Sequence, residues 1–234
     1  MIYESGLVIG HSKIHIKSDR NEAILEAIKG IKHHIKELFE YVKRNPLFQY
    51  SLEPIDVDSD APLIAKLMCE ASRAAGVGPM ASVAGTIADI GLKILLDKGA
   101  NTALIENGGE ISAYTSSEEI VVSIITGEVS LSGKMGLVIS KDNSPLGIGT
   151  SSGKTVQIVS FGEADSVTVI AENAALADAA ATAVCNAVTG SHIQRSVFKG
   201  LERARSIKGV KAAIIVREGY VGLIGELPRI VRIK

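Results

Sequence analysis

The sequence has no tryptophan, and only 4% of its 234 residues are aromatic. It also has no excess of charge of one sign, because 25 Lys and Arg residues are balanced by 26 Asp and Glu residues. Sequence-independent binding of DNA or RNA depends on a basic surface, so we expect no nucleic-acid partner. Hydrophobic residues make up 46% of the chain, which excludes a disordered protein. A folded chain of this length buries roughly 70–75% of its unfolded surface, which is enough for a large core.

Long apolar runs and paired cysteines are also missing. Asp89, Asp178 and nearby polar residues interrupt every stretch that approaches the ~20 apolar residues of a membrane span. The N-terminal residues include an acid and lack the basic start and apolar run of a signal peptide, so we expect a cytoplasmic protein with no membrane partner. Cys69 and Cys185 lie in apolar helical patterns, which favours free, buried thiols over a disulfide or a metal pair.

Apolar residues spaced three or four apart predict helices. The predicted ranges are 22–43, 63–75, 80–98, 174–188 and 194–205. Ser18 or Asp19 is the expected N-cap of the first helix, and Asp60 that of the second.

Alternating apolar residues and turn signals predict strands. Two short strands lie within 2–16 around the Gly10-His11 turn, and the others are 102–106, 119–126, 135–140, 156–160, 167–171, 212–216, 221–224 and 230–233. Strands and helices do not alternate strictly, so the pattern favours an α+β fold in one compact unit, residues 1–234. The acidic, proline-bearing connector at 53–62 is the place where a small N-terminal lobe, residues 1–58, would separate.

The segment 149–155, GTSSGKT, resembles a phosphate-binding loop. That motif requires four residues between its glycines, and Ile148 stands where the first glycine should be. The chain also leaves the segment as an alternating strand, whereas a phosphate loop opens a helix. We therefore reject a nucleotide-triphosphatase site. Two alternatives stay open: a hydroxyl-rich loop whose Ser151 and Ser152 contact a ligand phosphate, or an ordinary hairpin turn.

A carboxylate and a hydroxyl, Asp178 and Thr182, stand one helical turn apart and share a helix face. Two hard oxygen donors so placed suit Mg²⁺, which completes its octahedron with waters and substrate phosphates. The alternative is structural: an aspartate favoured by the helix macrodipole, and a threonine bonded back to the preceding turn.

Two glycine-containing segments allow close contact between a ligand and the backbone. The first segment, 78–89, offers Met80, Ala81 and Gly85, and the second, 106–110, offers Asn107, Gly108, Gly109 and Glu110. The structural alternatives are tight helix packing, with Asp89 paired to Lys93, and an Asn-Gly hairpin turn.

Taken in order, these segments resemble the ApbE-like flavin transferase superfamily. Its members carry a helix with Ala-Lys-Gly that ends in Asp, then a strand with Asn-x-Gly-Gly-Asp, and later Ala-Asp-Ala with a threonine four residues after the aspartate. The corresponding residues here are Ala84-Gly85 with Asp89, Asn107-Gly108-Gly109-Glu110, and Ala177-Asp178-Ala179 with Thr182. The resemblance covers about half of the chain, residues 76–188.

The resemblance implies an ApbE-like mixed sheet packed with helices, and Mg²⁺-dependent cleavage of FAD with transfer of FMN to a threonine of a partner protein. It implies that Asp178, the catalytic candidate, and Thr182 are side-chain metal ligands, and that Val83 supplies a main-chain carbonyl. Ala84 replaces the family's lysine, and residues 161–165 stand in place of its Asp-Pro-x-Thr-Gly loop. These departures resemble the uncharacterised, cytosolic branch of the superfamily.

Three functions are therefore open. The first is a Mg²⁺-dependent enzyme that binds and cleaves or transfers part of a flavin nucleotide, and the second is a catalytically degenerate small-molecule-binding protein on the same scaffold. The third is a structural subunit of a homo-oligomer, packed through alanine-rich helices.

Other candidate residues are weaker. His33 and His34 are adjacent and diverge by about 100° on a helix, so we interpret them as surface residues rather than ligands of one ion. His192 is either a general base or a solvent-facing loop residue. Asp165 lies in a loop of small residues before a strand and is kept as a site candidate.

Overall fold

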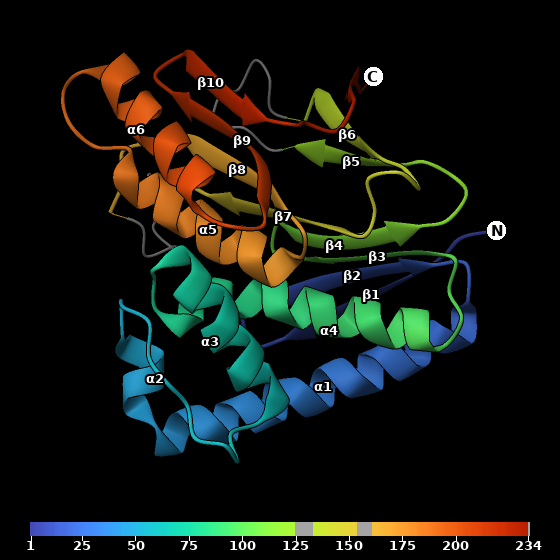
Figure 1. Ribbon diagram of the computed structural model, residues 1–234. Helices are drawn as coiled ribbons and strands as arrows, with labels where there is room; N and C mark the ends of the chain where they lie inside the picture. The colour runs from blue at the N-terminus through green and yellow to red at the C-terminus, as the bar shows by residue number, and fades with distance from the viewer. Residues whose placement is uncertain (125–132, 154–160, 234) are drawn as a thin grey trace.

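The computed structural model describes residues 1–124, 133–153 and 161–233, and it has an α+β architecture (Figure 1). The helices are α1 (Asn21–Arg44), α2 (Pro46–Tyr50), α3 (Leu63–Ala75), the 3-10 helix η1 (Pro79–Ser82), α4 (Val83–Asp97), α5 (Ala174–Ala187) and α6 (Ile193–Ser206). The strands are β1 (Tyr3–Ile9), β2 (Ser12–Ser18), β3 (Thr102–Asn107), β4 (Glu110–Thr115), β5 (Ile120–Ile124), β6 (Met135–Ile139), β7 (Leu146–Ser151), β8 (Ser166–Ala171), β9 (Val210–Arg217), β10 (Tyr220–Gly225) and β11 (Ile230–Arg232).

Eight strands form one sheet in the order β1-β2-β3-β4-β7-β8-β9-β10, and every neighbouring pair is antiparallel. A second sheet has the order β11-β6-β5. The predicted strand 230–233 is observed as β11, and it belongs to the second sheet. This strand pairs with β6, because the chain leaves β10 at Gly225 and crosses to the second sheet.

The large sheet is covered on both faces. Val167, Val169 and Ala171 of β8 pack in a core cluster with α5, whereas Ile170 packs in a different cluster with β5 and β6. Successive side chains of a strand point to opposite faces, so α5 lies on one face and the small sheet on the other. A third cluster joins β2, α1, α3, α4 and β3. The first hairpin and the long helix thus share a core with the segments that carry the candidate site.

The predicted helices 22–43 and 63–75 are confirmed as α1 and α3. Their predicted caps were wrong, because Arg20 and Pro62 occupy the cap positions without side-chain hydrogen bonds. The carboxylate of Asp19 instead accepts hydrogen bonds from the backbone N–H groups of Asn101 and Thr102, which ties the start of α1 to β3.

Three elements have no counterpart among the predicted ranges. They are the short helix α2, which starts at Pro46 just after the predicted helix 22–43, strand β4, and strand β7, which falls in a glycine-rich stretch interpreted as a loop. The predicted strand 156–160 lies outside the described residues. Cys69 and Cys185 are buried and form no disulfide with one another, as expected.

Helix α5 lies unusually close to β7, and glycine makes that approach possible. A Cβ atom added to Gly149 would stand 2.4 Å from the carbonyl carbon of Ala177, nearer than real Cβ contacts come. The alanines of α5 are buried, in a core cluster that includes residues of α3, α6, β8 and β9. They are therefore unavailable for packing against a second copy of the chain, which removes the basis for the expectation of oligomerisation through alanine-rich helices.

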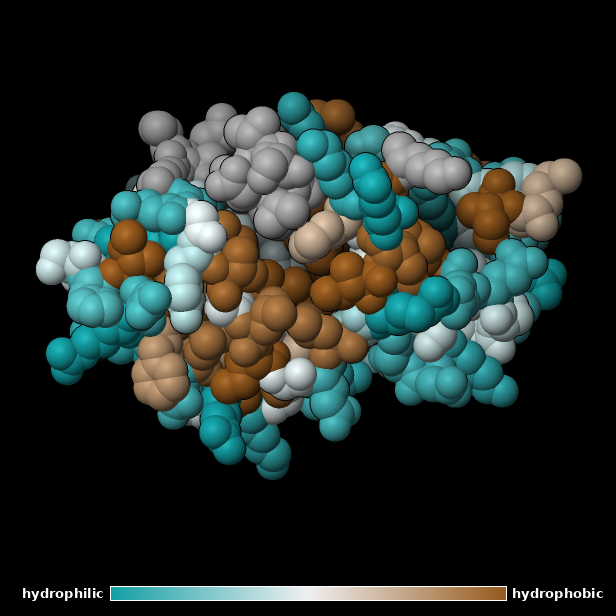
Figure 2. All heavy atoms as spheres, turned by 90° about the horizontal axis from the view of Figure 1, so that it is seen from above, coloured by the Kyte–Doolittle hydropathy of each residue, from teal (hydrophilic) through white to brown (hydrophobic). Residues whose placement is uncertain are grey.

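One helical stretch of the described residues, Pro79–Asp97, is long and apolar enough to cross a membrane by length and composition. Its most apolar window is 56% buried, as is typical of a core helix. Figure 2 views the molecule from the side that carries α6 and β10, and shows a hydrophobic area bordered by hydrophilic residues. Phe198, Val221 and Leu223 are exposed large hydrophobic residues of these two elements.

The contact between α5 and β7 gives a direct prediction. Gly149→Ala should lower the free energy of unfolding by about 3 kcal/mol, because its methyl group meets backbone atoms that cannot rotate away. Chemical denaturation measures this loss. Gly6→Ala in β1 is the matched control, since a Cβ atom there meets nothing within 4 Å. Equal stability of the two variants would contradict the packing described here.

Candidate functional site

Helices α4 and α5 begin side by side in the middle of the molecule (Figure 1), and a carboxylate of each helix accepts hydrogen bonds from the backbone at the start of the other. Asp178, in the second turn of α5, accepts a hydrogen bond from the backbone N–H of Gly85 in the first turn of α4 at 2.9 Å. Asp89 of α4 accepts hydrogen bonds from the backbone N–H groups of Ala174 at 2.9 Å and Ala175 at 2.8 Å, at the start of α5. Each helix therefore satisfies the free N–H groups of the other.

The hydroxyl of Ser112 on β4 donates to the carboxylate of Asp89 at 2.6 Å, so the same aspartate also ties both helices to the sheet. The proposed pairing of Asp89 with Lys93 was wrong, because Lys93 forms its ion pair with Asp97. Asp89 is thus a positioning residue. In the sequence it could be recognised only as the aspartate that ends the helix motif containing Ala84-Gly85. The sequence gives no local sign of its partners, which lie 85 and 86 residues away along the chain.

The β3–β4 turn docks against the start of α4. The side-chain amide of Asn107 donates to the carbonyl oxygen of Ala84 at 3.2 Å, and the carboxylate of Glu106 accepts from the N–H of Gly109 at 2.8 Å. Gly108 and Gly109 have φ angles of 69° and 116°, which favour glycine. The segment is therefore the turn of the β3–β4 hairpin, and the turn also fixes the backbone next to Asp178.

A second acid, Glu110, starts β4 and is only 7% exposed. It stands two residues before Ser112, so its side chain lies on the helix-covered face of the sheet. Burial raises the pKa of Glu110 well above its ordinary value, and the negative charge of Asp178 raises it further. Two poorly solvated carboxylates that repel one another thus lie on one side of the sheet.

Asp178 shows the same conflict. Burial raises its pKa to about 7, although the N–H groups of Gly85 and Ala84 favour its charged form. Burial likewise raises the pKa of Asp89, against the hydrogen bonds from Ser112, Ala175 and Ala174. Within the described residues, no Lys or Arg forms an ion pair with Asp178 or Glu110. A bound cation would relieve this repulsion.

Two hydroxyl groups complete the oxygen-rich surface. Ser151 ends β7 two residues after Gly149, on the side that faces α5, and is 3% exposed. Its buried hydroxyl has no hydrogen-bond partner in the part of the chain that the structure describes. Thr182 is half-buried on the same helix face as Asp178. None of the hydrogen bonds among described residues involves its hydroxyl, so the expected alternative of a bond back to the preceding turn is not what the structure shows.

The donor set fits a hard divalent cation. Carboxylate and hydroxyl oxygens are the ligands of Mg²⁺, and the orphaned hydroxyl of Ser151 is an unused polar group aimed at the same interface. Asp178 and Thr182 would hold the ion.

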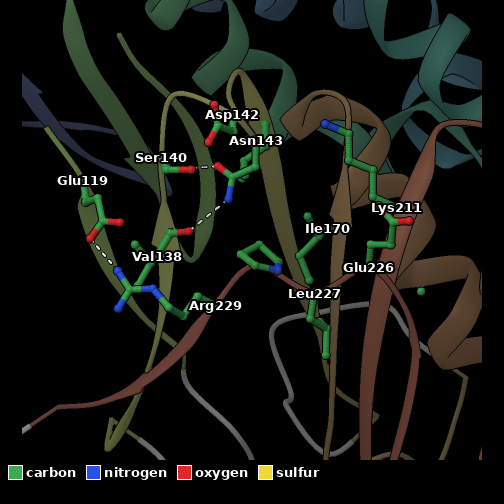
Figure 3. A pocket seen from close by; sticks show the side chains of 13 residues that line it. Glu119, Val138, Ser140, Asp142, Asn143, Ile170, Lys211, Glu226, Leu227 and Arg229 are labelled. Atoms are coloured by element: carbon green, nitrogen blue, oxygen red, sulfur yellow. Dashed lines mark hydrogen bonds and ion pairs between the residues drawn. The ribbon is translucent and has the colours of Figure 1, made fainter. Parts of the chain in front are cut away.

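A large cavity lies elsewhere. A space of about 710 Å³ opens between the two sheets, with Leu146 and Ile170 among its lining residues (Figure 3). The ion pair of Arg229 with Glu119 borders it, and the side chain of Asn143 braces its rim by bonding the backbone of Ser140 and Val138. Ile170 packs with the small sheet, so this cavity is on the opposite face of the large sheet from Asp178.

Comparison with known proteins identifies the family. A family model described as "AbpE bacteria" matches residues 4–209. The chain belongs to this ApbE-like family. A UPF0280 protein of Methanothermobacter thermautotrophicus is 41% identical over 227 residues, which cover 96% of this chain and 86% of that protein. A UPF0280 protein of Methanocaldococcus jannaschii is 37% identical over 234 residues, which cover 99% and 94%.

Solved ApbE structures share the fold. A point mutant of the flavin transferase ApbE from Vibrio cholerae matches with a TM-score of 0.61 at 13% identity, covering 96% of this chain and 97% of that one. The apo form of the flavinyl transferase ApbE from Pseudomonas stutzeri matches with a TM-score of 0.61 at 15% identity, covering 98% and 95%. At these identities the matches establish the architecture of this ApbE-like protein. The α+β prediction and the predicted family are thereby confirmed.

The remaining predicted residues of the ApbE-like site lie near the start of α4 or at the end of β7. Met80 and Ala81 lie half-buried in η1, and Val83 is the first residue of α4, so all three border the start of that helix. Ser152 follows β7 directly.

Two other candidates have structural tasks away from this interface. Asp165 accepts a hydrogen bond from the N–H of Glu218 in the β9–β10 turn, and His192 caps α6 by accepting from the N–H of Arg195.

The raised pKa of Asp178 predicts a pH dependence of stability. A carboxyl whose folded pKa is near 7 and whose unfolded pKa is near 3.8 stabilises the fold below pH 4, and this contribution is lost as the pH rises to 7. Asp178→Asn removes the titrating group and keeps an oxygen for the N–H of Gly85. Between pH 4.5 and pH 8, the parent protein should lose on the order of 3 kcal/mol more stability than this variant.

Urea denaturation at a series of pH values measures the difference. Asp97→Asn, at an exposed aspartate paired with Lys93, is the control and should follow the parent. Parallel profiles for the parent and Asp178→Asn would show that Asp178 is not desolvated as described.

Proposed function

We propose that this ApbE-like protein binds a flavin nucleotide, FAD, together with Mg²⁺ at the interface of α4, α5 and β7, and acts on its pyrophosphate. The observation that carries the proposal is a pair of poorly solvated, mutually repelling carboxylates, the half-buried Asp178 and the buried Glu110, beside the unpartnered hydroxyl of Ser151. These groups are unfavourable in a merely structural interface, and each is a normal partner of a cation or of a hydrated phosphate group.

Each protein group has a defined task in this proposal. Asp178 and Thr182 hold the metal from one face of α5, with the carbonyl of Val83 as the expected main-chain ligand. When bound, Mg²⁺ would offset the charge that develops on phosphate oxygens during phosphoryl transfer. Met80, Ala81 and Gly85 on one side, and Gly108 and Gly109 on the other, present backbone to the nucleotide, while Ser151 and Ser152 contact its phosphates.

The reaction we propose breaks the P–O–P bridge of FAD on the FMN side. A hydroxyl oxygen of water or of an acceptor threonine bonds to the FMN phosphorus, the hydroxyl proton passes to solvent, and AMP leaves. Because Ala84 stands in place of the family's lysine, positioning of the phosphates depends on the metal and on backbone N–H groups rather than on a side-chain cation.

A second candidate function is favoured by the same substitution. Without the lysine, and with residues 161–165 in place of the family's loop, the scaffold would bind the nucleotide and leave it intact. The two functions are distinguished by chromatographic detection of FMN and AMP after incubation with FAD. An enzyme releases both products, and a binding protein releases neither.

We also propose that the chain folds as one unit, because β2, α1 and α4 share a core cluster. A cytoplasmic location remains our prediction. If the chain forms homo-oligomers, we expect them to use the exposed apolar residues of α6 and β10 rather than the buried alanines of α5.

The direct test is Mg²⁺-dependent binding of FAD to the Thr182→Val variant, measured by titration calorimetry. Valine matches the shape of threonine but offers no oxygen, and the hydroxyl makes no hydrogen bond in the described structure, so the variant should fold normally. We expect FAD affinity in the presence of Mg²⁺ to fall at least tenfold, or about 1.4 kcal/mol, and affinity without Mg²⁺ to stay unchanged.

Asp178→Ala should abolish the Mg²⁺ effect, although it also removes the bond to Gly85 and needs a circular dichroism check of folding. Asp97→Ala is the matched control, because it removes a carboxylate at the far end of α4, outside the proposed site, and should keep the Mg²⁺ effect. FAD binding that does not depend on Mg²⁺, or an equal response of all three variants, would reject the proposed site.

A further inference from the structure

The exposed side of α1 carries a second cluster of metal-binding groups, unrelated to the motifs of the ApbE-like family. Glu37 follows His33 by four residues and His34 by three. Residues three and four apart are neighbours on a helix, so Glu37 lies near both histidines, and the two imidazole rings also lie close together, with centroids 5.3 Å apart. The divergence of about 100° expected for adjacent helix positions therefore does not keep the two rings apart.

The distances suit one small cation. Nδ1 of His34 lies 2.9 Å from Oε2 of Glu37, and Nε2 of His33 lies 3.5 Å from Oε1. Ligand bonds of 2.0–2.2 Å to tetrahedral zinc place neighbouring ligand atoms roughly 3.3 Å apart. One ligand atom from each of the three residues falls within 4.8 Å of the others, so modest side-chain rotation brings all three to one ion.

The surroundings leave this cluster available. The side chains of His34 and Glu37 are 20% and 35% exposed, so two of the three ligands are partly held by the fold, while His33 is 65% exposed and gives access from solvent. Two neighbouring lysines on α1 form ion pairs with other acids: Lys29 pairs with Glu26 and Lys36 with Glu40.

We propose that His33, His34 and Glu37 form a surface site for a borderline divalent cation of the zinc class, with water in the fourth position. Two imidazole nitrogens and one carboxylate oxygen are the ligand types of zinc sites with an open position. Imidazole is a poor ligand for Mg²⁺, so this site and the oxygen-rich site at Asp178 select different ions. The proposal does not rest on the proposed flavin chemistry.

The alternative explanation of the same distances is a pair of ion pairs between protonated histidines and Glu37. It predicts no affinity for a metal ion beyond that of any exposed histidine. Ion pairing and metal binding can therefore be separated by measuring the stoichiometry and the residue dependence of zinc binding.

The test uses untagged, full-length protein, titrated with Zn²⁺ by calorimetry in a buffer that contains excess Mg²⁺. We expect one equivalent of Zn²⁺ to bind, and Co²⁺ as a second probe to give the visible absorption of a tetrahedral site. His34→Ala and Glu37→Gln should each weaken Zn²⁺ binding at least tenfold. His11→Ala, which removes a histidine from an exposed turn, should leave it unchanged.

Thr182→Val is the second control, because it alters the Asp178 site without touching α1. Loss of zinc binding in Thr182→Val but not in His34→Ala would place the ion at Asp178 and overturn the proposal. So would the absence of saturable Zn²⁺ binding in the parent, or equal affinities of the parent, His34→Ala and Glu37→Gln. Circular dichroism confirms that each variant is folded before its affinity is compared.

Discussion

The reciprocal hydrogen bonds between the carboxylates of α4 and α5 and the backbone N–H groups at the start of the other helix are the interaction on which the site depends. Asp89 satisfies the first N–H groups of α5, and Asp178 satisfies an N–H group at the start of α4. Both helices therefore begin at one point, and the partial positive charges of two helix starts converge there. Glycine permits the approach, since a Cβ atom at Gly85 would lie 2.1 Å from the carbonyl oxygen of Ala174. The alanines of α5 then fill the space against β7 with little side-chain volume.

This arrangement has an energetic cost that a purely structural interface would avoid. Three carboxyl groups, Asp89, Glu110 and Asp178, are held where burial raises their pKa values. Asp89 has three hydrogen-bond donors and is accounted for by its positioning task. Glu110 and Asp178 repel one another, and Ser151 holds a buried hydroxyl without a partner. Ionisable groups with strongly shifted pKa values concentrate at binding and catalytic sites, which is why the site is proposed here and not at the cavity between the sheets.

The parts of the structure with local causes could be predicted from the sequence. Helix α3 was predicted at its observed bounds because its apolar spacing is a property of the segment itself. Strand β7 was missed because Gly147 and Gly149 look like loop residues, and their reason, the closeness of α5, is a tertiary contact. For the same reason the spacing of Asp178 and Thr182 could be recognised along one helix, whereas the partners of Asp89 and the burial of Glu110 depend on segments far apart in the chain.

The account rests on the claim that Asp178 and Thr182 face a common ligand at the start of α4. A crystal structure of the protein with FAD and Mn²⁺, in place of Mg²⁺, tests it most directly, because the anomalous signal locates manganese independently of the protein coordinates. We predict a manganese peak within bonding distance of the Asp178 carboxylate and the Thr182 hydroxyl, bridged to phosphate oxygens. A nucleotide bound elsewhere, with Asp178 still engaged only with Gly85, would contradict the account.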